Sequence, residues 1–262
     1  MAHEGFPATD YERIARQYDD HRAQWAIPPD DVLASLIDER PRGVLVLDVG
    51  CGTGLYMANQ RQHLSGSAVR WIGLDPSASM LGQATKKEGP VSYVQGVAES
   101  LPFGNDTIDY AHSSYSFHHF ADKATALDEI CRVLRPGGRL RVVNVDPWSM
   151  DGWWVYEFFP ETSQIDRRRF WPVPRLVDEL ERRGLTAEAS VETSGRTLRL
   201  GDVLEEAESR TISQLDVLDD DAYDRGLRKL RTVVAPDPNA RIERESAILR
   251  LTATVPVRRG NP

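Results

Sequence analysis

One stretch decides the fold of this chain: Val44-Leu45-Val46-Leu47-Asp48-Val49-Gly50-Cys51-Gly52-Thr53-Gly54. Four apolar residues lead into an acid, which is the pattern of a buried parallel strand. The glycines that follow on alternate positions predict a turn with unusual dihedral angles, where a ligand can lie against the backbone. A helix after Gly54 would point its free N–H groups back at that ligand. The stretch therefore predicts a nucleotide-type cradle at the carboxyl end of the first strand.

The spacing of the glycines indicates which class of nucleotide-type ligand the turn could bind. A dinucleotide fold needs Gly-x-Gly-x-x-Gly, and the third glycine would fall where Leu55 stands. A P-loop needs Gly-Lys followed by Ser or Thr, and no lysine lies near this turn. What stands here, Asp-x-Gly-x-Gly-x-Gly, resembles motif I of class I S-adenosylmethionine (SAM) methyltransferases. The alternative is an ordinary strand-to-helix turn in a Rossmann-like domain.

That resemblance assigns roles to the acid and to the turn. Asp48 would hold the ammonium of SAM, directly or through water. The turn would let the amino-acid end of the cofactor lie on the backbone. The turn residues implied in cofactor binding are Gly50, Cys51, Gly52 and Gly54.

Composition bounds the class of protein. The 262 residues with 40% apolar content suffice for one large α/β domain, or for a domain with a cap. A formal net charge of −8 argues against nucleic acid as a partner. We find no cluster with metal-ligand spacing, and therefore predict no metal.

The sequence also bears on the compartment. It has no run of about 18 apolar residues, so we expect no membrane partner. Met1-Ala2-His3-Glu4 lacks a basic region followed by an apolar one, so we expect no signal peptide. Cys51 and Cys131 stand inside expected core elements, where they suit a reducing compartment. The predicted localisation is the cytoplasm.

A second apolar run, Trp71-Ile72-Gly73-Leu74-Asp75, predicts a parallel strand that ends in an acid. A carboxylate there can accept both ribose hydroxyls, as in the dinucleotide fold. The methyltransferase resemblance implies the same site, followed by a short helix that Pro76 and Ser77 open. By that resemblance Asp75 and Pro76 contact the cofactor, Asp75 on the ribose, and Met80 packs on adenine. The alternative for Met80 is ordinary core packing.

The third strand, Val91–Gly96, runs into Val97-Ala98-Glu99-Ser100-Leu101-Pro102-Phe103. This segment resembles the Gly-Asp-Ala-Glu-x-Leu-Pro-Phe motif of methyltransferases, in which the aspartate reaches the adenine amino group. Val97 stands in place of that aspartate, so the side-chain acceptor is missing. Adenine is then expected to rely on backbone groups near Ala98 and Glu99.

The fourth strand, Thr107–Ser113, leads into Ser114-Tyr115-Ser116-Phe117-His118-His119-Phe120. The stretch resembles the Phe-Asp to His-His segment of the small-molecule group called type 11 methyltransferases, where the strand end faces the transferring methyl group. Ser113 is therefore a candidate cofactor contact. His118 and His119 are candidate general bases, and the alternative is a structural helix start. We favour His118 because it stands nearer the strand end, while His119 can turn toward the core.

The order of elements predicts a Rossmann-like α/β fold. The further expected elements are a helix over Lys123–Leu134 that ends at Arg135–Gly138, a fifth strand over Leu140–Val145, a sixth over 185–191 and a seventh over Ala247–Val257. The alternation in the seventh strand suits a strand that is antiparallel to its neighbours. We therefore expect a single methyltransferase domain over residues 1–262. It should have a seven-stranded sheet flanked by helices, with the last strand antiparallel and a helical cap inserted.

Two segments, 146–174 and 195–243, exceed what a bare sheet needs and are the predicted substrate cap. The first is rich in aromatic residues: Trp148, Trp153, Trp154, Tyr156, Phe158, Phe159, Phe170 and Trp171. In the second, Asp202–Glu205 resembles a capping box, and Tyr223, Leu227, Leu230 and Val233 mark a helix. The alternative for the aromatic residues is core packing within the cap itself, and for the second segment a subunit interface.

One more segment is expected to lie near the cofactor. Tyr11-Glu12-Arg13-Ile14-Ala15-Arg16-Gln17-Tyr18-Asp19 resembles the N-terminal segment of the same methyltransferases, in which the second tyrosine lies over the cofactor pocket. By that resemblance Tyr18 is a lid. The alternative is a tyrosine packed on the domain surface.

The leading functional prediction is methyl transfer from SAM to the oxygen, nitrogen or carbon of a small organic acceptor. Some type 11 relatives place a carboxylate just after the fifth strand, where this chain has Asn144, with Asp146 two positions later. A second hypothesis is a SAM-fold protein that binds cofactor or metabolite without methyl transfer. Val97 and Asn144 favour it, whereas the intact glycine triplet, Asp48 and Asp75 oppose it. A third, a nicotinamide-dependent reductase, is opposed by Leu55. The sequence identifies neither the acceptor nor the oligomeric state.

Overall fold

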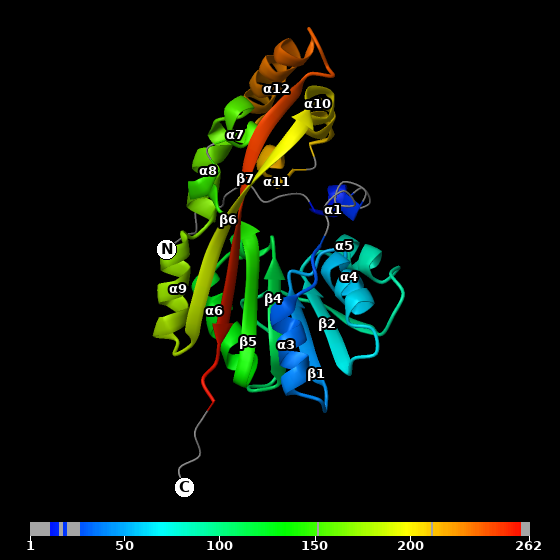
Figure 1. Ribbon diagram of the computed structural model, residues 1–262, viewed down its shortest axis with the longest axis vertical. Coiled ribbons are helices and arrows are strands. Elements are labelled where there is room, and N and C mark those ends of the chain that lie inside the picture. Colours follow the sequence, from blue (N-terminus) through cyan, green and yellow to red (C-terminus); the bar gives the residue numbers. More distant parts are fainter. Residues whose placement is uncertain (1–10, 16–17, 20–26, 151, 211, 258–262) are drawn as a thin grey trace. The chain divides into compact units, whose positions relative to one another are not determined.

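The computed structural model describes residues 11–15, 18–19, 27–150, 152–210 and 212–257, so the expectation about Met1–Glu4 lies outside the described residues. The strands of this part form one mixed sheet in the order β3-β2-β1-β4-β5-β7-β6 (Figure 1). They are β1 (Val44–Val49), β2 (Val69–Asp75), β3 (Val91–Gln95), β4 (Ile108–Ser114), β5 (Leu134–Val145), β6 (Thr186–Arg199) and β7 (Arg241–Thr254).

Strand β1 lies between β2 and β4 and is parallel to both. The pairing sets Asp48 opposite Gly73 of β2 on one side and opposite His112 of β4 on the other. Parallel strands present their carboxyl ends at the same edge of a sheet. The acid of the glycine motif and the end of β4 therefore lie next to each other.

Strand β7 runs antiparallel to β5. The N–H of Gly137 donates to the carbonyl of Val255 at 2.8 Å, and the N–H of Asp146 donates to the carbonyl of Ala247 at 3.0 Å. The predicted α/β fold with an antiparallel last strand is thus confirmed. Strand β5 begins earlier than predicted, at Leu134. It includes Arg135–Gly138, which we expected only to end the preceding helix, and its register against β4 shifts there.

The described part of the chain divides into two compact units: unit 1 within residues 145–172 and 191–248, and unit 2 within residues 11–144, 173–190 and 249–257. Unit 2 holds α1 (Tyr11–Ile14), α3 (Asp31–Glu39), α4 (Leu55–His63), α5 (Ala78–Ala84), η1 (Phe117–His119), α6 (Lys123–Val133) and α9 (Val173–Arg182). Unit 1 holds η2 (Pro147–Ser149), α7 (Trp154–Phe158), α8 (Glu161–Arg169), α10 (Leu200–Ser209), α11 (Ser213–Asp216) and α12 (Asp220–Val234). Among the described helices, none has the length and apolar character of a membrane span.

A buried carboxylate organises the packing of α3 and α4 in unit 2. Asp30 caps α3, because its Oδ1 accepts from the N–H of Leu33 at 3.0 Å. Its Oδ2 accepts from the hydroxyls of Tyr56 and Tyr110, each at 2.6 Å. Burial, together with the nearby acid, raises the pKa of both tyrosines well above the ordinary value. Both hydroxyls therefore stay protonated and act as donors.

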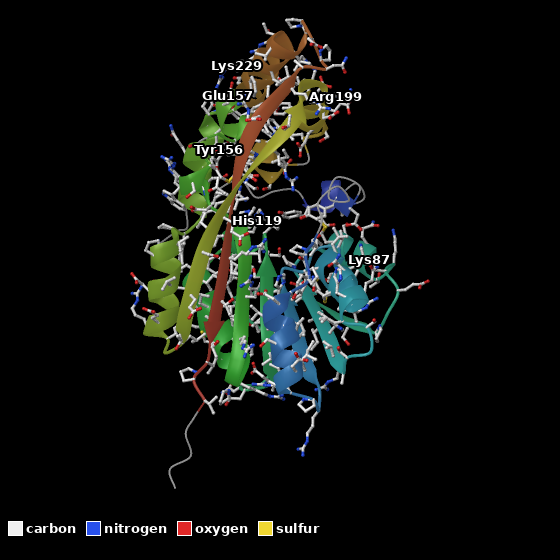
Figure 2. All side chains as sticks on the ribbon, in the orientation of Figure 1. Lys87, His119, Tyr156, Glu157, Arg199 and Lys229 are labelled. Atoms are coloured by element: carbon white, nitrogen blue, oxygen red, sulfur yellow. The ribbon has the colours of Figure 1, made fainter. Side chains whose placement is uncertain are left out.

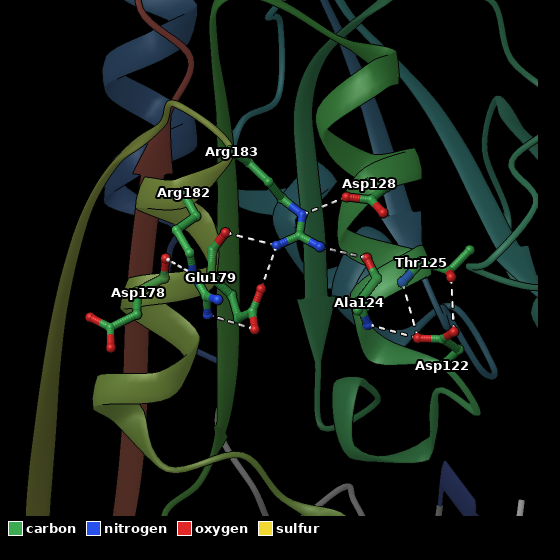
Figure 3. A network of polar contacts seen from close by, with 8 residues as sticks. All are labelled: Asp122, Ala124, Thr125, Asp128, Asp178, Glu179, Arg182 and Arg183. Atoms are coloured by element: carbon green, nitrogen blue, oxygen red, sulfur yellow. Dashed lines mark hydrogen bonds and ion pairs between the residues drawn. The ribbon is translucent and has the colours of Figure 1, made fainter. Parts of the chain in front are cut away.

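Arg183 ties α9 to α6 (Figure 3). Its guanidinium donates to Asp128 Oδ1 at 2.7 Å, to Glu179 Oε2 at 2.6 Å and to the carbonyl of Ala124 at 3.1 Å. Asp122 caps the start of α6 and accepts from the N–H of Ala124 at 3.0 Å. The network fixes the beginning of α6, which comes shortly after η1 in the chain.

Unit 1 has a hydrophobic core of its own. The buried core side chains include Trp154, Val155, Phe158, Phe159, Leu200, Val203, Ala207, Leu215, Leu218, Tyr223, Leu227, Leu230 and Val234. Gly226 allows α12 to pack closely, since a Cβ there would lie 2.2 Å from the Phe159 ring. Trp154, Phe158 and Phe159 therefore pack inside this unit, as the alternative interpretation held, whereas Trp148 is 37% exposed.

Unit 1 differs from the sequence expectation at its strand and helix boundaries. Strands β6 and β7 are longer than predicted, and α10 begins at Leu200 directly after β6. The predicted capping box at Asp202 is wrong, because that residue lies inside the first turn of α10 and pairs with Arg199. The predicted apolar stripe of α12 also ends differently. Val233 is 44% exposed, and Val234 takes the buried position.

Candidate functional site

The turn after β1 is left-handed at its three glycines, with φ of 73° at Gly50, 52° at Gly52 and 74° at Gly54. A Cβ on Gly50 would lie 2.5 Å from the Cβ of Ser116, and a Cβ on Gly54 would lie 2.8 Å from the hydroxyl of Tyr93. A Cβ on Gly52 would meet no atom of the described residues within 4 Å. Internal packing therefore requires the outer glycines, whereas Gly52 faces open space where a ligand can approach the backbone.

Asp75, at the end of β2, lies against the same turn. Its Oδ2 accepts from the N–H of Gly52 at 2.8 Å, and its Oδ1 accepts from the N–H of Ser77 at 2.9 Å. Burial is the main cause that raises the pKa of Asp75. Ser77 caps α5 by accepting from the N–H of Met80 at 3.1 Å, and Pro76 is exposed. The predicted ribose acid is thus held by backbone N–H groups on two sides.

Asp48 has a partner that the sequence analysis missed. His112 Nδ1 lies 2.8 Å from Asp48 Oδ1, and each residue is only 2% exposed. The imidazole stacks on the ring of Tyr56, with centroids 3.4 Å apart and planes 8° apart. The sequence does show a histidine within an apolar strand, and this could have indicated a buried polar contact. That Asp48 is the partner of this histidine is known only from the register of β4 against β1.

Two carboxylates anchor the segment that begins with α1. Glu12 Oε1 accepts from the hydroxyl of Ser77 at 2.7 Å. Asp19 accepts from the hydroxyl of Thr53 and pairs with the ammonium of Lys87, which Figure 2 labels. Helix α1 is therefore attached to the loop after β2, and Asp19 is attached to the glycine turn.

Apolar contacts hold the same segment. Met80, 2% exposed, forms a small buried cluster with Ala15, against which Tyr11 and Tyr18 pack. The rings of Tyr11 and Tyr18 meet edge to face, with centroids 6.5 Å apart. The predicted lid residue Tyr18 and the predicted adenine contact Met80 thus belong to one cluster.

The two candidate bases have different surroundings. His118 is 6% exposed, and its Nδ1 lies 3.2 Å from Asn144 Nδ2. His119 is partly exposed, and its Nε2 lies 2.6 Å from the hydroxyl of Tyr11 (Figure 2). We expected His119 to turn toward the core, but His118 is the buried one. Successive residues of a 3-10 helix point about 120° apart, so only one of the pair can face inward.

Two further predicted contacts lie mainly inside the protein. Ser113 is fully buried, and its hydroxyl lies 2.7 Å from that of Ser116 below the glycine turn. Cys51 is 8% exposed, and burial raises the pKa of its thiol far above the ordinary value. Cys51 therefore stays a neutral thiol.

The segment after β3 combines an exposed apolar residue with buried neighbours. Val97 is 47% exposed, and Ala98 is 4% exposed. Glu99 Oε1 accepts from the N–H of Asp122 at 3.0 Å, which links this segment to the cap of α6. An apolar side chain thus stands where related methyltransferases have an acceptor.

These groups fit SAM. Helix α4 starts at Gly54 without a side-chain cap, so the helix start offers N–H donors to a ligand. A carboxylate at the end of β1 suits an ammonium, and one at the end of β2 suits ribose hydroxyls. The open side of Gly52 leaves room for the ligand to lie against the turn.

Comparison with known proteins indicates the class of domain. The family model for a methyltransferase domain matches residues 47–142. The O-methyltransferase resE of Aspergillus sclerotiorum is 37% identical over 107 residues, covering 39% of this chain and 40% of that protein. The ubiquinone/menaquinone biosynthesis C-methyltransferase UbiE of an Enterobacter species is 39% identical over 141 residues, covering 52% and 53%.

A solved structure shows the same fold. A protein from an antibiotic biosynthesis pathway of Anabaena variabilis superposes with a TM-score of 0.67 at 22% identity, covering 86% of this chain and 97% of that one. The chain spans about a third to a half of the length of the curated relatives that it matches, from 34% to 53%.

The chain thus carries a class I SAM-dependent methyltransferase domain, centred on residues 47–142. The predicted resemblance, the predicted fold and SAM as the cofactor of such a domain are confirmed at this level.

Proposed function

We propose that the chain is an enzyme that transfers a methyl group from SAM to a small organic acceptor. The observation that carries this proposal is the left-handed turn Gly50–Gly54, with Asp48 and Asp75 at the ends of the strands beside it. Gly52 is the position at which the turn faces open space. When bound, SAM would supply a sulfonium methyl group that is open to displacement by a nucleophile.

In this proposal the residues of unit 2 bind and orient the reactants. Asp48 holds the ammonium of the cofactor, Asp75 holds the ribose hydroxyls, and Gly52 lets the backbone approach. Tyr18 and Met80 cover the adenosine side, because the anchored N-terminal segment brings them together. Alignment and exclusion of water then account for much of the rate enhancement.

A histidine of η1 is proposed as the general base for an oxygen or nitrogen acceptor. His118 and His119 adjoin each other, with ring centroids 3.9 Å apart. Tyr11 holds the outer ring through its hydroxyl, and Asn144 lies beside the inner one. Either ring can take a proton from an acceptor, since imidazole titrates near neutral pH. A carbon acceptor would need less assistance from a general base.

The acceptor class rests on the relatives. One of them is named an O-methyltransferase and another a C-methyltransferase, so both kinds of acceptor atom belong in the screen, with nitrogen as the third. The predicted cap segments 146–174 and 195–243 are proposed to select the acceptor. Cys51 and Cys131 are free thiols, which supports a cytoplasmic location.

A second candidate is a protein that binds SAM or a metabolite without methyl transfer. The exposed side chain of Val97 and the amide of Asn144 favour it, because each stands where some relatives carry a carboxylate. Calorimetric titration with SAM, S-adenosylhomocysteine and NADH tests the cofactor. Binding of SAM but not NADH supports both candidates and excludes a nicotinamide enzyme.

Turnover separates the two candidates. Purified protein is incubated with SAM labelled in the methyl group and with fractionated small-molecule extract. Label that moves into a small molecule identifies the acceptor and supports the enzyme. Tight SAM binding, with no transfer to any fraction, would instead leave the binding protein as the better account.

A further inference from the structure

We infer that His112 is a positioning residue, which fixes the carboxylate of Asp48 in the orientation that receives the amino-acid end of SAM. The inference deepens the proposed function and rests on it. The contact of His112 Nδ1 with Asp48 Oδ1 at 2.8 Å carries it, since both side chains are almost fully buried.

The strand register brings the two side chains together. Asp48 of β1 and His112 of β4 are direct partners across a parallel pair of strands. Partner residues on neighbouring strands project their side chains to the same face of the sheet. A donor at this position of β4 therefore reaches the carboxylate at the end of β1 without distortion of either strand.

The hydrogen-bond roles follow from the chemistry of the two groups. An ionised carboxylate can only accept, so Nδ1 of His112 carries the hydrogen. The bond engages Oδ1 and leaves Oδ2 of Asp48 for an ammonium.

Tyr56 prevents the imidazole from turning away. Its ring lies flat on that of His112, with centroids 3.4 Å apart. The Tyr56 hydroxyl is itself fixed, because it donates to Asp30 Oδ2 at 2.6 Å. One chain of contacts therefore runs from the cap of α3 through Tyr56 and His112 to Asp48. Rotamers held by packing and hydrogen bonds in this way keep a binding group in place.

The test compares two ligands that differ only at the end that Asp48 faces. S-adenosylhomocysteine carries the amino-acid end, and 5′-methylthioadenosine shares the adenosine and the thioether but lacks that end. His112→Leu removes the donor and should weaken S-adenosylhomocysteine by about 10-fold, as expected for a lost hydrogen bond to a charged group. Affinity for 5′-methylthioadenosine should stay within about 2-fold, because its contacts lie elsewhere.

His112→Asn serves as the conservative variant. Its amide nitrogen can take the place of Nδ1, so it should restore most of the affinity for S-adenosylhomocysteine. Tyr110→Phe is the matched control: Tyr110 also lies buried on β4 and also donates to a carboxylate, but that carboxylate is Asp30. Tyr110→Phe should leave the ratio of the affinities for S-adenosylhomocysteine and 5′-methylthioadenosine unchanged. Where His112→Leu does not fold, His112→Gln replaces it, since its longer side chain displaces the donor.

Each outcome decides between the alternatives. A loss confined to S-adenosylhomocysteine, with recovery in His112→Asn, supports the positioning role. Equal losses for both ligands show a structural effect, and no loss for either shows that Asp48 needs no support; both results overturn the inference while leaving the proposed function intact. If the wild-type protein binds neither ligand, the proposed function fails and the inference falls with it.

Discussion

Unit 1 and unit 2 both bury carboxylates, and the surroundings of those carboxylates differ. In unit 2, Asp48 and Asp75 end adjacent parallel strands beside a turn whose Gly52 faces open space. In unit 1, Asp166 is fully buried, its Oδ2 accepts from the hydroxyl of Tyr156 at 2.9 Å, and its Oδ1 lies 4.0 Å from Arg169 Nη1.

The difference is the reason why we propose Asp48 and Asp75, and not Asp166, as carboxylates that bind a ligand. Burial alone does not separate them, since all three acids are buried. The position does: strand ends beside an open glycine turn suit a ligand, whereas Asp166 of α8 is held by side chains of its own unit. We therefore expect changes at the turn to affect binding, and changes at Asp166 to affect stability.

The largest effect is expected at the turn. Gly52→Val should abolish SAM binding, because the side chain would fill the space that the cofactor needs and φ is 52° there. Gly184→Val is the matched control, since Gly184 also has positive φ, 83°, and also has no neighbouring atom among the described residues within 4 Å of a Cβ. Calorimetry should show binding in the control alone. If a folded Gly52→Val protein binds SAM with wild-type affinity, the cofactor site lies elsewhere.

Replacement of the candidate bases should have the next largest effect. His118→Ala should leave SAM affinity nearly intact and lower turnover by about 10²–10⁴-fold, if the imidazole removes a proton from the acceptor. The wild-type rate should then rise with pH in one step, as the imidazole loses its proton. That step should vanish in the variant.

The companion variant His119→Ala shows which of the two histidines acts as the base. Tyr11→Phe removes only the hydroxyl that contacts His119, so it should reduce turnover if His119 is the base and leave it unchanged if His118 is. The measurement is the pH–rate profile of each variant with the identified acceptor. Profiles of unchanged shape and height in both alanine variants would rule out base catalysis by either histidine.

A smaller effect, on stability alone, is expected at Asp166. Burial raises its pKa from the ordinary 3.8 to about 6. A carboxyl with a raised pKa is more stable protonated in the folded state, so its contribution is present below about pH 4 and is lost as pH rises through about 6. The change amounts to about 3 kcal/mol across this window.

Denaturant unfolding at several pH values measures this contribution. In Asp166→Asn, the free energy of unfolding should lose the part of its pH dependence that falls between pH 4 and 6. The comparison of slopes is the readout, because the variant also removes the charge opposite Arg169 and so changes the absolute stability. Parallel curves for the two proteins would show that Asp166 does not titrate in that range.

The smallest effects should have opposite signs in the two units. Gly82→Ala in α5 should raise the free energy of unfolding by about 0.5–1 kcal/mol, since a Cβ there meets nothing among the described residues and alanine favours a helix. Gly226→Ala in α12 should lower it by about 1–2 kcal/mol, because its Cβ would lie 2.2 Å from the Phe159 ring. Equal stabilisation by both changes would contradict the packing of unit 1.

The sequence by itself determined the sheet and the class of cofactor. The run from Val44 to Gly54 and the acid at Asp75 are local patterns, since strand hydrophobicity and glycine dihedral angles depend on neighbouring residues in the chain. The starts of α5 and α6 followed in the same way, because each begins beside a side chain that caps it.

Only the tertiary structure decided the partners. The contact of His112 with Asp48 depends on which strands are neighbours and in what register. The different burial of His118 and His119 depends on how η1 meets the sheet. The packing of Trp154 and Phe159 inside unit 1 depends on α12, which lies far along the chain. These contacts join distant residues, so no local pattern in the sequence specifies them.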